Sequence, residues 1–264
     1  MNIGICGFGF VGQAINDFFK NEELTIYIYD KYKNINCINI LFATDILYIC
    51  LPTLYSEVNK TYDMMEIDST LEQLAVNNYK GVILIKSTVL PDYCSYINNK
   101  YKNLIILHNP EFLSARTASY DFANQSHIIF GYTVQSQYIA DPIFDLYKVL
   151  FPNAIISIVT AEEAGLTKLA CNSFYATKIQ YFTEIYLLCN KMGISYDRVK
   201  ELMLNNNWIN PMHTSVPGHD NMISFGGACF PKDIEALNQY MKTNDVSHNV
   251  VEAVIKERNY MRKE

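Results

Sequence analysis

Short apolar runs alternate with polar or helix-like stretches as far as residue 160, and this alternation restricts the possible folds more than any other feature of the sequence. The runs are rich in Ile, Val, Leu and Tyr and have the length of single strands. Near-continuous apolar strands joined by crossovers are typical of a parallel sheet that is covered on both faces. We therefore predict a doubly wound α/β domain over residues 1–160, with strands at NIGIC (2–6), LTIYIY (24–29), ILYICL (46–51), VILIKS (82–87), NLIIL (103–107), HIIFG (127–131) and AIISIV (154–159).

The pattern changes after Thr160. Residues 161–192 contain no proline and a single glycine, Thr160 can cap a helix, and acidic residues follow in the first turn. We predict one long central helix of about 45 Å. Such a helix is too long for one small domain to cover, so we expect it to be the spine of a helical domain over residues 161–264 and to join a homodimer.

The remainder of this helical domain has weaker signals. The stretch SYDRVKELMLNN (195–206) predicts a second helix, and the Pro, Gly and Asn content of residues 208–224 predicts an irregular loop. DIEALNQYMKT (233–243) and NVVEAVIKERNYM (249–261) have the pattern of two final amphipathic helices.

Composition argues against several classes of partner. The formal net charge is -6 and the isoelectric point is about 5.4, whereas proteins that bind nucleic acids or anionic membranes usually present a basic surface. The seven cysteines have no CxxC spacing, which indicates a reducing compartment and neither a disulfide framework nor a metal site. No apolar run approaches the ~18 residues of a membrane span. We expect a cytoplasmic protein.

A glycine-rich turn follows the first predicted strand and opens a helix. Gly7, Gly9 and Gly12 have GxGxxG spacing, in which the first glycine permits the turn, the second admits a pyrophosphate and the third allows close packing. Phe10 and Val11 belong to the same predicted cofactor site. The alternative is a glycine turn without a ligand.

Asp30 ends the second predicted strand, where a carboxylate can bind both ribose hydroxyls of an adenosine. A carboxylate there also repels a 2'-phosphate, which favours NAD over NADP, although Lys31 and Lys33 follow closely.

A second set of polar residues is spread over the chain. Lys168 and Asn172 lie four residues apart and so share one face of the long helix, where they either meet a ligand or form a solvated face. Glu111 and Thr88 each follow a predicted strand at the carboxyl edge of the sheet, where α/β folds bind ligands. The alternative for both is loop capping.

The stretch FGGACFPKD (225–233) contains the cysteine whose surroundings are most informative. A nearby cation favours a thiolate, and Lys232 offers one to Cys229. Gly226 and Gly227 allow backbone amides to approach a bound group. Cys229 is therefore either a nucleophile or an inert buried thiol.

These segments together resemble the UDP-glucose/GDP-mannose dehydrogenase family of nucleotide-sugar 6-dehydrogenases. The resemblance rests on GICGFGFVG, ICLPT, IKSTVLP, NPEFL, EAGLTKLACNSFYATKI and FGGACFPKD, which have the family's order and spacing over nearly the whole chain. It implies that NAD oxidises the C6 alcohol of a nucleotide sugar, most commonly UDP-glucose, in two steps through a cysteine thiohemiacetal and thioester.

The resemblance also implies a role for each matching residue. Cys229 is the nucleophile, Lys168 and Asn172 polarise the C6 oxygen, Asp233 and Thr88 position a water, and Glu111 serves as a base. Thr53, Thr88 and Lys232 belong to the cofactor site, and Glu111, Phe112, Leu113, Lys168, Asn172, Phe225 and Gly226 to the sugar site.

Three departures from the family bear on the substrate. Members usually continue into a third, nucleotide-binding domain, so we expect the 208–224 loop or a neighbouring subunit to hold the nucleotide here. Ala115, followed by Arg116, stands where members commonly have a second glutamate, which alters hydrolysis or cofactor contacts. The loop before Cys229 lacks the arginine that members supply to a partner's substrate; His213 or His219 replaces it only in part.

Two other functions remain open. A one-step hydroxyacid dehydrogenase also pairs a Rossmann-like domain with a helix that bears Lys-x-x-x-Asn, but it leaves Cys229 without a role. A non-catalytic protein that binds NAD or a nucleotide sugar would retain the fold without turnover.

Overall fold

The computed structural model describes residues 1–20, 24–137 and 141–262, which form two compact units. The N-terminal unit comprises residues 1–56 and 62–168, and the C-terminal unit comprises residues 57–61 and 169–264. Each unit has hydrophobic clusters of its own.

A seven-stranded sheet forms the centre of the N-terminal unit, with the strand order β2-β1-β3-β6-β7-β8-β9. Neighbouring strands are parallel except β7 and β8, which are antiparallel. The chain turns from β1 to β2 on one side and then crosses to β3 on the other, so the turn after β1 lies at a topological switch point. The strands are β1 (Asn2–Cys6), β2 (Thr25–Tyr29), β3 (Ile46–Ile49), β6 (Val82–Ile85), β7 (Ile105–His108), β8 (His127–Tyr132) and β9 (Ile155–Thr160).

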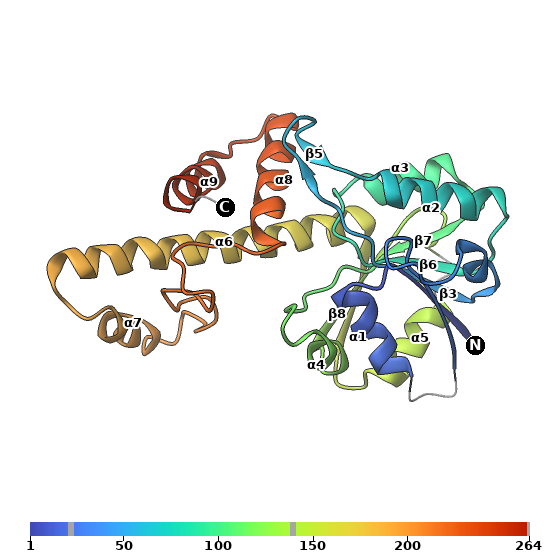
Figure 1. The fold of residues 1–264 in the computed structure, drawn as a ribbon, viewed down its shortest axis with the longest axis horizontal. Helices are drawn as coiled ribbons and strands as arrows, with labels where there is room; N and C mark the ends of the chain where they lie inside the picture. The colour runs from blue at the N-terminus through green and yellow to red at the C-terminus, as the bar shows by residue number, and fades with distance from the viewer. Residues whose placement is uncertain (21–23, 138–140, 263–264) are drawn as a thin grey trace. The chain divides into compact units, whose positions relative to one another are not determined.

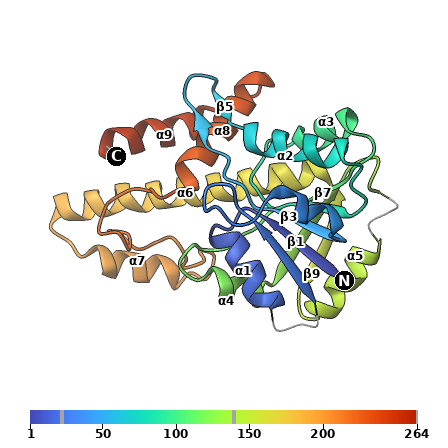
Figure 2. The same ribbon diagram turned by 45° about the vertical axis from the view of Figure 1, so that its right-hand side comes forward.

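Helices cover both faces of this sheet (Figures 1 and 2). Successive side chains of a strand point to opposite faces, and β3 illustrates the result. Ile46 and Tyr48 belong to the hydrophobic cluster formed with α1, α4 and α5, whereas Leu47 and Ile49 belong to the cluster formed with α2 and α3. The helices are α1 (Phe10–Phe19), η1 (Ile38–Ala43), α2 (Met65–Val76), α3 (Tyr93–Lys100), α4 (Ala118–Ala123) and α5 (Asp141–Leu150).

The predicted fold class is confirmed. Each of the seven predicted apolar runs overlaps one strand of the sheet, and helices lie on both of its faces. The antiparallel pairing of β7 with β8 was not predicted, nor was the short hairpin of β4 (Tyr55–Ser56) and β5 (Thr61–Tyr62).

The predicted long helix is α6 (Ala161–Met192). The Thr160 hydroxyl accepts a hydrogen bond from the Glu163 backbone N–H at 3.2 Å, and the Glu163 carboxylate accepts one from the Thr160 backbone N–H at 2.8 Å. This reciprocal pair is a capping box, which fixes where the helix begins.

The C-terminal unit is built around α6, with α7 (Tyr196–Leu204) on one side and α8 (Phe230–Thr243) and α9 (Asn249–Met261) on the other (Figure 1). Phe182, Cys189 and Tyr196 form one core cluster between α6 and α7. Phe225 and Ile234 belong to a second cluster with residues of α6 and α9. α7 and α9 lie within the ranges predicted from the sequence, whereas α8 begins at Phe230, before its predicted start at residue 233. Among the described residues, no helix combines the length and the apolar character needed to cross a membrane.

Candidate active site

The glycine turn between β1 and α1 has a different constraint at each of its three glycines. Gly7 has a φ of 92°, which favours glycine, and a Cβ on it would lie 2.7 Å from the Cys50 carbonyl oxygen. A Cβ on Gly12 would collide with the carbonyl oxygen of Gly7. A Cβ on Gly9, by contrast, would meet no atom within 4 Å. The space in front of Gly9 therefore fits a ligand group.

The first turn of α1 begins at this glycine. Gly9 is the N-cap residue and has no side chain that could cap the helix. The backbone N–H groups of Phe10 and Val11 are among those that have no acceptor within the helix itself. Such a helix N-terminus, with its partial positive charge, suits a pyrophosphate. These residues fit the dinucleotide that the sequence predicts.

Asp30 follows β2 and holds the glycine turn. Its carboxylate accepts hydrogen bonds from the backbone N–H groups of Phe8 at 2.8 Å, Lys33 at 2.9 Å and Tyr32 at 3.0 Å. Partial burial acts to raise the pKa of Asp30, but these three N–H groups outweigh it, and the pKa is lowered. The carboxylate is therefore charged at neutral pH.

The two lysines after Asp30 have partners of their own. Lys31 forms an ion pair with Glu66 at 3.1 Å, and the Lys33 ammonium donates to the Phe8 carbonyl at 2.6 Å. Neither contact counters the preference of the Asp30 carboxylate for a ribose with both hydroxyls unmodified.

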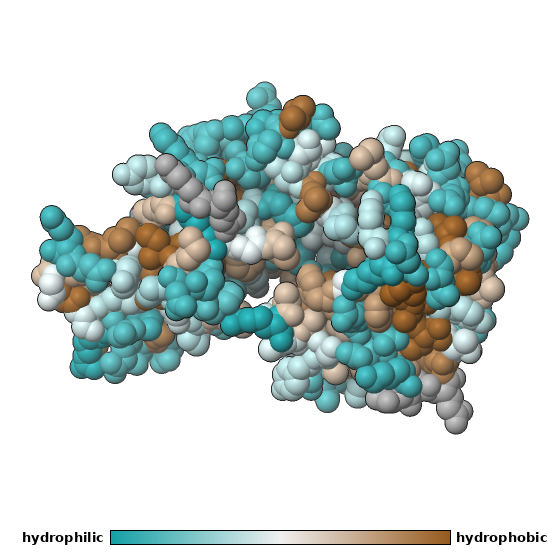
Figure 3. Space-filling model, viewed as in Figure 1, coloured by the Kyte–Doolittle hydropathy of each residue, from teal (hydrophilic) through white to brown (hydrophobic). Residues whose placement is uncertain are grey.

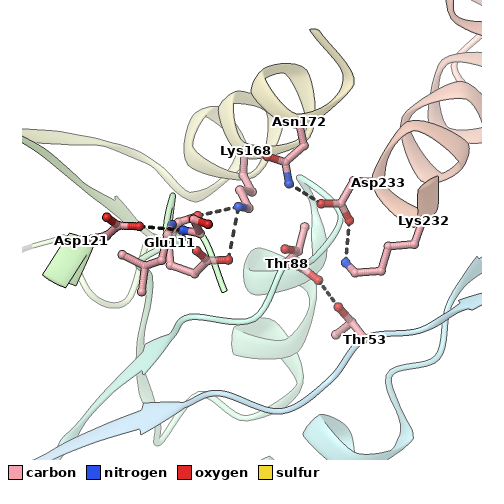
Figure 4. Close-up of polar contacts among 10 residues, drawn as sticks. Thr53, Thr88, Glu111, Asp121, Lys168, Asn172, Lys232 and Asp233 are labelled. Atoms are coloured by element: carbon pink, nitrogen blue, oxygen red, sulfur yellow. Dashed lines mark hydrogen bonds and ion pairs between the residues drawn. The ribbon is translucent and has the colours of Figure 1, made fainter. Parts of the chain in front are cut away.

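Two threonines lie beyond β3 and β6 at the same edge of the sheet. The Thr53 hydroxyl donates to the Thr88 carbonyl at 2.7 Å, and both residues are buried (Figure 4). The adjacent Ser87 hydroxyl donates to the Leu51 carbonyl at 2.7 Å. These bonds tie the two loops together in the region where the sequence analysis predicts the cofactor site.

Glu111 and Lys168 form a buried ion pair in the N-terminal unit (Figure 4). The Lys168 ammonium lies 2.5 Å from the Glu111 backbone carbonyl oxygen and 3.4 Å from its carboxylate. The same ammonium lies 5.1 Å from the centre of the Phe112 ring, which is partly exposed. The other carboxylate oxygen of Glu111 accepts from the Leu113 backbone N–H at 2.6 Å. The pair thus has the partners that a buried charge requires.

Asp233 is the centre of a second polar cluster, in the C-terminal unit. Its carboxylate accepts from the Asn172 amide at 2.6 Å and pairs with the Lys232 ammonium at 2.5 Å (Figure 4). Asp233 is fully buried, and it lies in the first turn of α8, where the helix dipole favours a negative charge. Lys168 and Asn172, which the sequence placed on one face of α6, therefore bind different carboxylates.

Cys229 is the N-cap residue of α8 and is partly exposed. Gly227 has a φ of 79°, and a Cβ on it would meet no atom within 4 Å. The cysteine thus follows an open glycine turn at a helix N-terminus, a position that favours a thiolate. The Phe225 side chain is buried in the core of the C-terminal unit, so a ligand at this turn would meet its backbone.

Sequence reasoning missed two buried ionisable groups near Glu111. The Lys86 ammonium donates to the Asn109 side-chain oxygen at 2.9 Å, and burial lowers the pKa of Lys86 to about 8. Burial also lowers the pKa of His108 to about 4. The signal for Lys86 was present, because a lysine stands within the apolar run VILIKS.

Ala115, which stands where family members commonly have a second glutamate, lies on the surface. Ala115 and Arg116 are exposed in the segment between Glu111 and α4. Asp121, on α4, accepts hydrogen bonds from the Ser114 backbone N–H at 2.9 Å and the Thr117 hydroxyl at 2.7 Å. The segment is therefore fastened by Asp121.

Family models match most of the chain. The NAD binding domain of the UDP-glucose/GDP-mannose dehydrogenase family matches residues 33–150, and the central domain of the same family matches residues 162–259. The first of these matches confirms NAD as the cofactor that the glycine turn and Asp30 predict.

Individual proteins agree with these matches. The chain is 32% identical over 248 residues to the UDP-glucose 6-dehydrogenase of Rickettsia bellii (strain RML369-C), covering 90% of this chain and 50% of that protein. The chain spans about half the length of this relative. A UDP-glucose dehydrogenase structure from the archaeon Pyrobaculum islandicum superimposes with a TM-score of 0.82 at 21% identity, over 98% of this chain and 68% of that one.

A solved structure that this chain matches over most of both lengths also has a similar fold. The structure of 3-hydroxyisobutyrate dehydrogenase from Mycobacterium tuberculosis superimposes with a TM-score of 0.72 at 14% identity, over 97% of this chain and 91% of that one. At this identity the likeness concerns the fold alone.

Proposed function

The chain belongs to the UDP-glucose/GDP-mannose dehydrogenase family, and from this premise we propose that it oxidises the C6 alcohol of a nucleotide sugar to the carboxylate with NAD, with UDP-glucose as substrate and UDP-glucuronate as product. The observation that carries this proposal is the position of Cys229, a partly exposed thiol at the N-terminus of α8, after an open glycine turn. A one-step alcohol oxidation has no use for such a thiol.

Covalent capture by Cys229 divides the four-electron oxidation into separate steps. Bound NAD supplies the hydride acceptor for both oxidations. The first oxidation converts the C6 alcohol to an aldehyde. The Cys229 sulfur then bonds to the aldehyde carbon, and the thiol proton ends on the oxygen of the thiohemiacetal. Oxidation of this adduct gives a thioester, and water then breaks the carbon–sulfur bond, which releases the carboxylate and restores the thiol.

The proposed roles of the polar residues follow from what they bind. Lys168 is a cation held in place by Glu111, so it can stabilise negative charge on the C6 oxygen. Asn172 is oriented by Asp233, and it lies one turn from Lys168 on α6. Asp233 and Thr88 would position the hydrolytic water, and the Glu111 carboxylate would accept its proton.

We assign the remaining residues to binding. Gly9 and the N–H groups of Phe10 and Val11 would hold the pyrophosphate, Gly7 and Gly12 would allow the turn that presents them, and Asp30 would bind the adenosine ribose. Thr53, Thr88 and Lys232 would complete the cofactor site. Phe112, Leu113, Gly226 and the backbone of Phe225 would border the sugar.

The first experiment counts the NADH released when limiting UDP-glucose is exhausted with NAD in excess. We expect two molecules of NADH for each UDP-glucose, because both oxidations pass electrons to NAD. One molecule would contradict the thioester route. None, with GDP-mannose and other nucleotide sugars also inert, would contradict the proposed function.

A one-step hydroxyacid dehydrogenase is the second candidate, because such enzymes also pair a Rossmann-like domain with a helix that bears Lys-x-x-x-Asn, as Lys168 and Asn172 do on α6. It predicts one NADH per substrate and full turnover by Cys229→Ser. A non-catalytic protein would bind NAD or a nucleotide sugar, measurable by calorimetry, and release no NADH.

We also propose that the protein is a homodimer joined along α6. Large apolar side chains are exposed along this helix, and Figure 3 shows hydrophobic surface near its C-terminal end. Phe174 and Met192 are each 62% exposed, and contact with a second copy would bury such side chains. The exposed apolar residues of α6 are Leu166, Phe174, Tyr181, Leu187, Leu188 and Met192.

Size-exclusion chromatography with light scattering tests this proposal. We expect a dimer at micromolar concentration, and a monomer when Phe174→Asp and Leu188→Asp are combined. Tyr260→Asp is the matched control, because Tyr260 is an exposed aromatic residue on α9. A monomeric unmodified protein would rule out the dimer.

A further inference from the structure

Ser224 stands at the start of the segment that leads to Cys229, and its backbone conformation is unusual. Its φ is 61°, in the left-handed region that glycine adopts more readily than serine. The residue is 5% exposed. A buried non-glycine residue keeps this conformation only when its surroundings hold it there.

Two side chains of α6 bind Ser224. Its backbone N–H donates to the Thr183 hydroxyl at 3.1 Å, and its own hydroxyl donates to the Gln180 side-chain oxygen at 2.6 Å. Thr183 is fully buried and Gln180 is 1% exposed. Both hydrogen bonds are thus shielded from water, which makes them stronger than exposed ones.

Two arginines at the C-terminal end of the C-terminal unit bind the same segment. Arg262 donates to the Ser224 carbonyl at 3.4 Å and forms an ion pair with Asp220 at 2.5 Å. Arg258 donates to the Phe225 carbonyl at 3.3 Å. The N–H, the hydroxyl and the carbonyl of Ser224 therefore all have partners, and these come from two separate helical regions.

The backbone between Phe225 and Cys229 can adopt several conformations unless both ends of this segment are fixed. Gly226 and Gly227 have no Cβ, so their backbone is the least restricted in the segment. On the far side, the Cys229 carbonyl accepts from the Asp233 backbone N–H at 3.0 Å, which fixes Cys229 to α8. Ser224 supplies the corresponding fixed point on the near side.

We propose that Ser224 is a positioning residue for Cys229, and that Gln180, Thr183 and Arg262 hold it in its left-handed conformation. This inference rests on the proposed function, in which Cys229 is the nucleophile. Positioning within a fraction of an ångström matters for a covalent step, because misplaced reacting groups lower the rate steeply.

The test measures the alkylation of Cys229 by iodoacetamide in the full chain, followed for each cysteine by peptide mass spectrometry. Ser224→Ala removes the hydroxyl bound to Gln180 and keeps the backbone groups. We expect Cys229 to react about fivefold faster, as the loss of one buried hydrogen bond implies. Cys189, which is buried in the same unit, should react at an unchanged rate. In turnover, kcat should fall with little change in KM.

Asp220→Asn provides a second variant that disturbs folding less, because Asp220 is exposed. It weakens the ion pair with Arg262, and we expect about a twofold acceleration at Cys229. Arg198→Gln is the matched control, because it breaks an exposed ion pair with Glu201 on α7 and should change neither rate.

Two results would overturn the proposal: an unchanged Cys229 rate in both variants, or equal acceleration of Cys229 and Cys189, which would indicate general loosening of the unit. The alkylation requires no substrate. If no nucleotide sugar yields NADH, the proposed function fails while the selective acceleration at Cys229 still decides whether Ser224 positions this thiol.

Discussion

Two of the open glycine turns that precede helices in the described part of the chain, those at Gly9 and Gly227, are held in different ways. In the first, between β1 and α1, the Gly7 backbone N–H donates to the Tyr29 carbonyl at 2.9 Å and the Phe8 backbone N–H donates to the Asp30 carboxylate at 2.8 Å, so the neighbouring strand and one side chain that follows it hold the turn. In the second, before α8, the side chains of Gln180, Thr183 and Arg262 hold Ser224.

The residue at each N-cap also differs. The first turn has Gly9 at this position, which leaves only backbone groups for a ligand, whereas the second has Cys229. Backbone N–H groups at a helix N-terminus suit a phosphate group and require no particular side chain at the N-cap. A turn held by side chains can be adjusted residue by residue, which suits a group that reacts.

Replacement of the thiol should give the largest difference between the two turns. We expect Cys229→Ser to lower the rate of carboxylate formation about a thousandfold or more, the scale seen when a nucleophile is removed. NAD binding by the first turn, measured by calorimetry, should be unchanged. Cys171→Ser is the control, because Cys171 is also partly exposed and lies on α6. Equal losses in both variants would remove the special role of Cys229.

Asp30→Asn should give the next largest effect, because the carboxylate would bind the ribose and also holds the Phe8 N–H. We expect NAD to bind about tenfold to a hundredfold more weakly, the range for hydrogen bonds to a charged group. The dissociation constant measured by fluorescence titration checks this. Unchanged affinity would show that Asp30 only shapes its loop.

The same carboxylate predicts an acid dependence of stability. Its pKa is lower in the folded protein than in the unfolded chain, where it is about 3.9. The contribution of Asp30 to the free energy of unfolding is therefore complete above the unfolded-state pKa and is lost as the pH falls through the lower folded-state pKa. Denaturant unfolding of Asp30→Asn and the unmodified protein should differ by a constant free energy from pH 8 to 5 and converge in stronger acid.

Gly9→Ala should have a smaller effect, confined to binding. Its Cβ would meet no protein atom, so the melting temperature should be unchanged. The methyl group would occupy the space in front of α1, and we expect NAD to bind about tenfold more weakly, or roughly 1.4 kcal/mol. Gly12→Ala is the contrasting variant, because its Cβ would collide with the Gly7 carbonyl and should lower the melting temperature. A Gly9→Ala protein with full NAD affinity would show that this space is not used.

Lys33→Met should have the smallest effect. The Lys33 ammonium donates to the Phe8 carbonyl of the first turn. Among the described contacts, it is the one side-chain amine on this turn. Because the strand β2 and Asp30 also hold this turn, we expect NAD affinity to change about twofold or less. A tenfold loss, measured by the same titration, would mean that the first turn depends on the Lys33 side chain as well as on Asp30.

Sequence reasoning succeeded where the signal is local. The glycine turn, the strands and the Thr160 cap of α6 each lie within a few consecutive residues, so spacing alone indicates them. The direction of β8 gave no such signal, because a strand buried on both faces has an apolar run that reads the same in either direction.

The candidate site was predicted as a set of residues but not as a set of contacts. Lys168 and Glu111 are 57 positions apart, and nothing in the spacing indicates that they pair. The left-handed conformation of Ser224 depends on Gln180 and Arg262, which are likewise distant in sequence. Phe225 is buried by residues that are distant in the sequence, such as Ala176 and Val254, so its neighbours in the chain do not indicate its burial.

The reversal of β8 and β9 has a consequence for what the sheet can offer a ligand. A helix that follows a strand generally runs back against it, so the helices of a parallel sheet leave the carboxyl edge and present their N-terminal dipoles there. β9 runs against the main set of strands, and the helix after it carries Lys168 to Glu111, just beyond the carboxyl end of β7. One edge of the sheet therefore receives a full ionic charge from the body of a helix, in addition to the partial charge of a helix end.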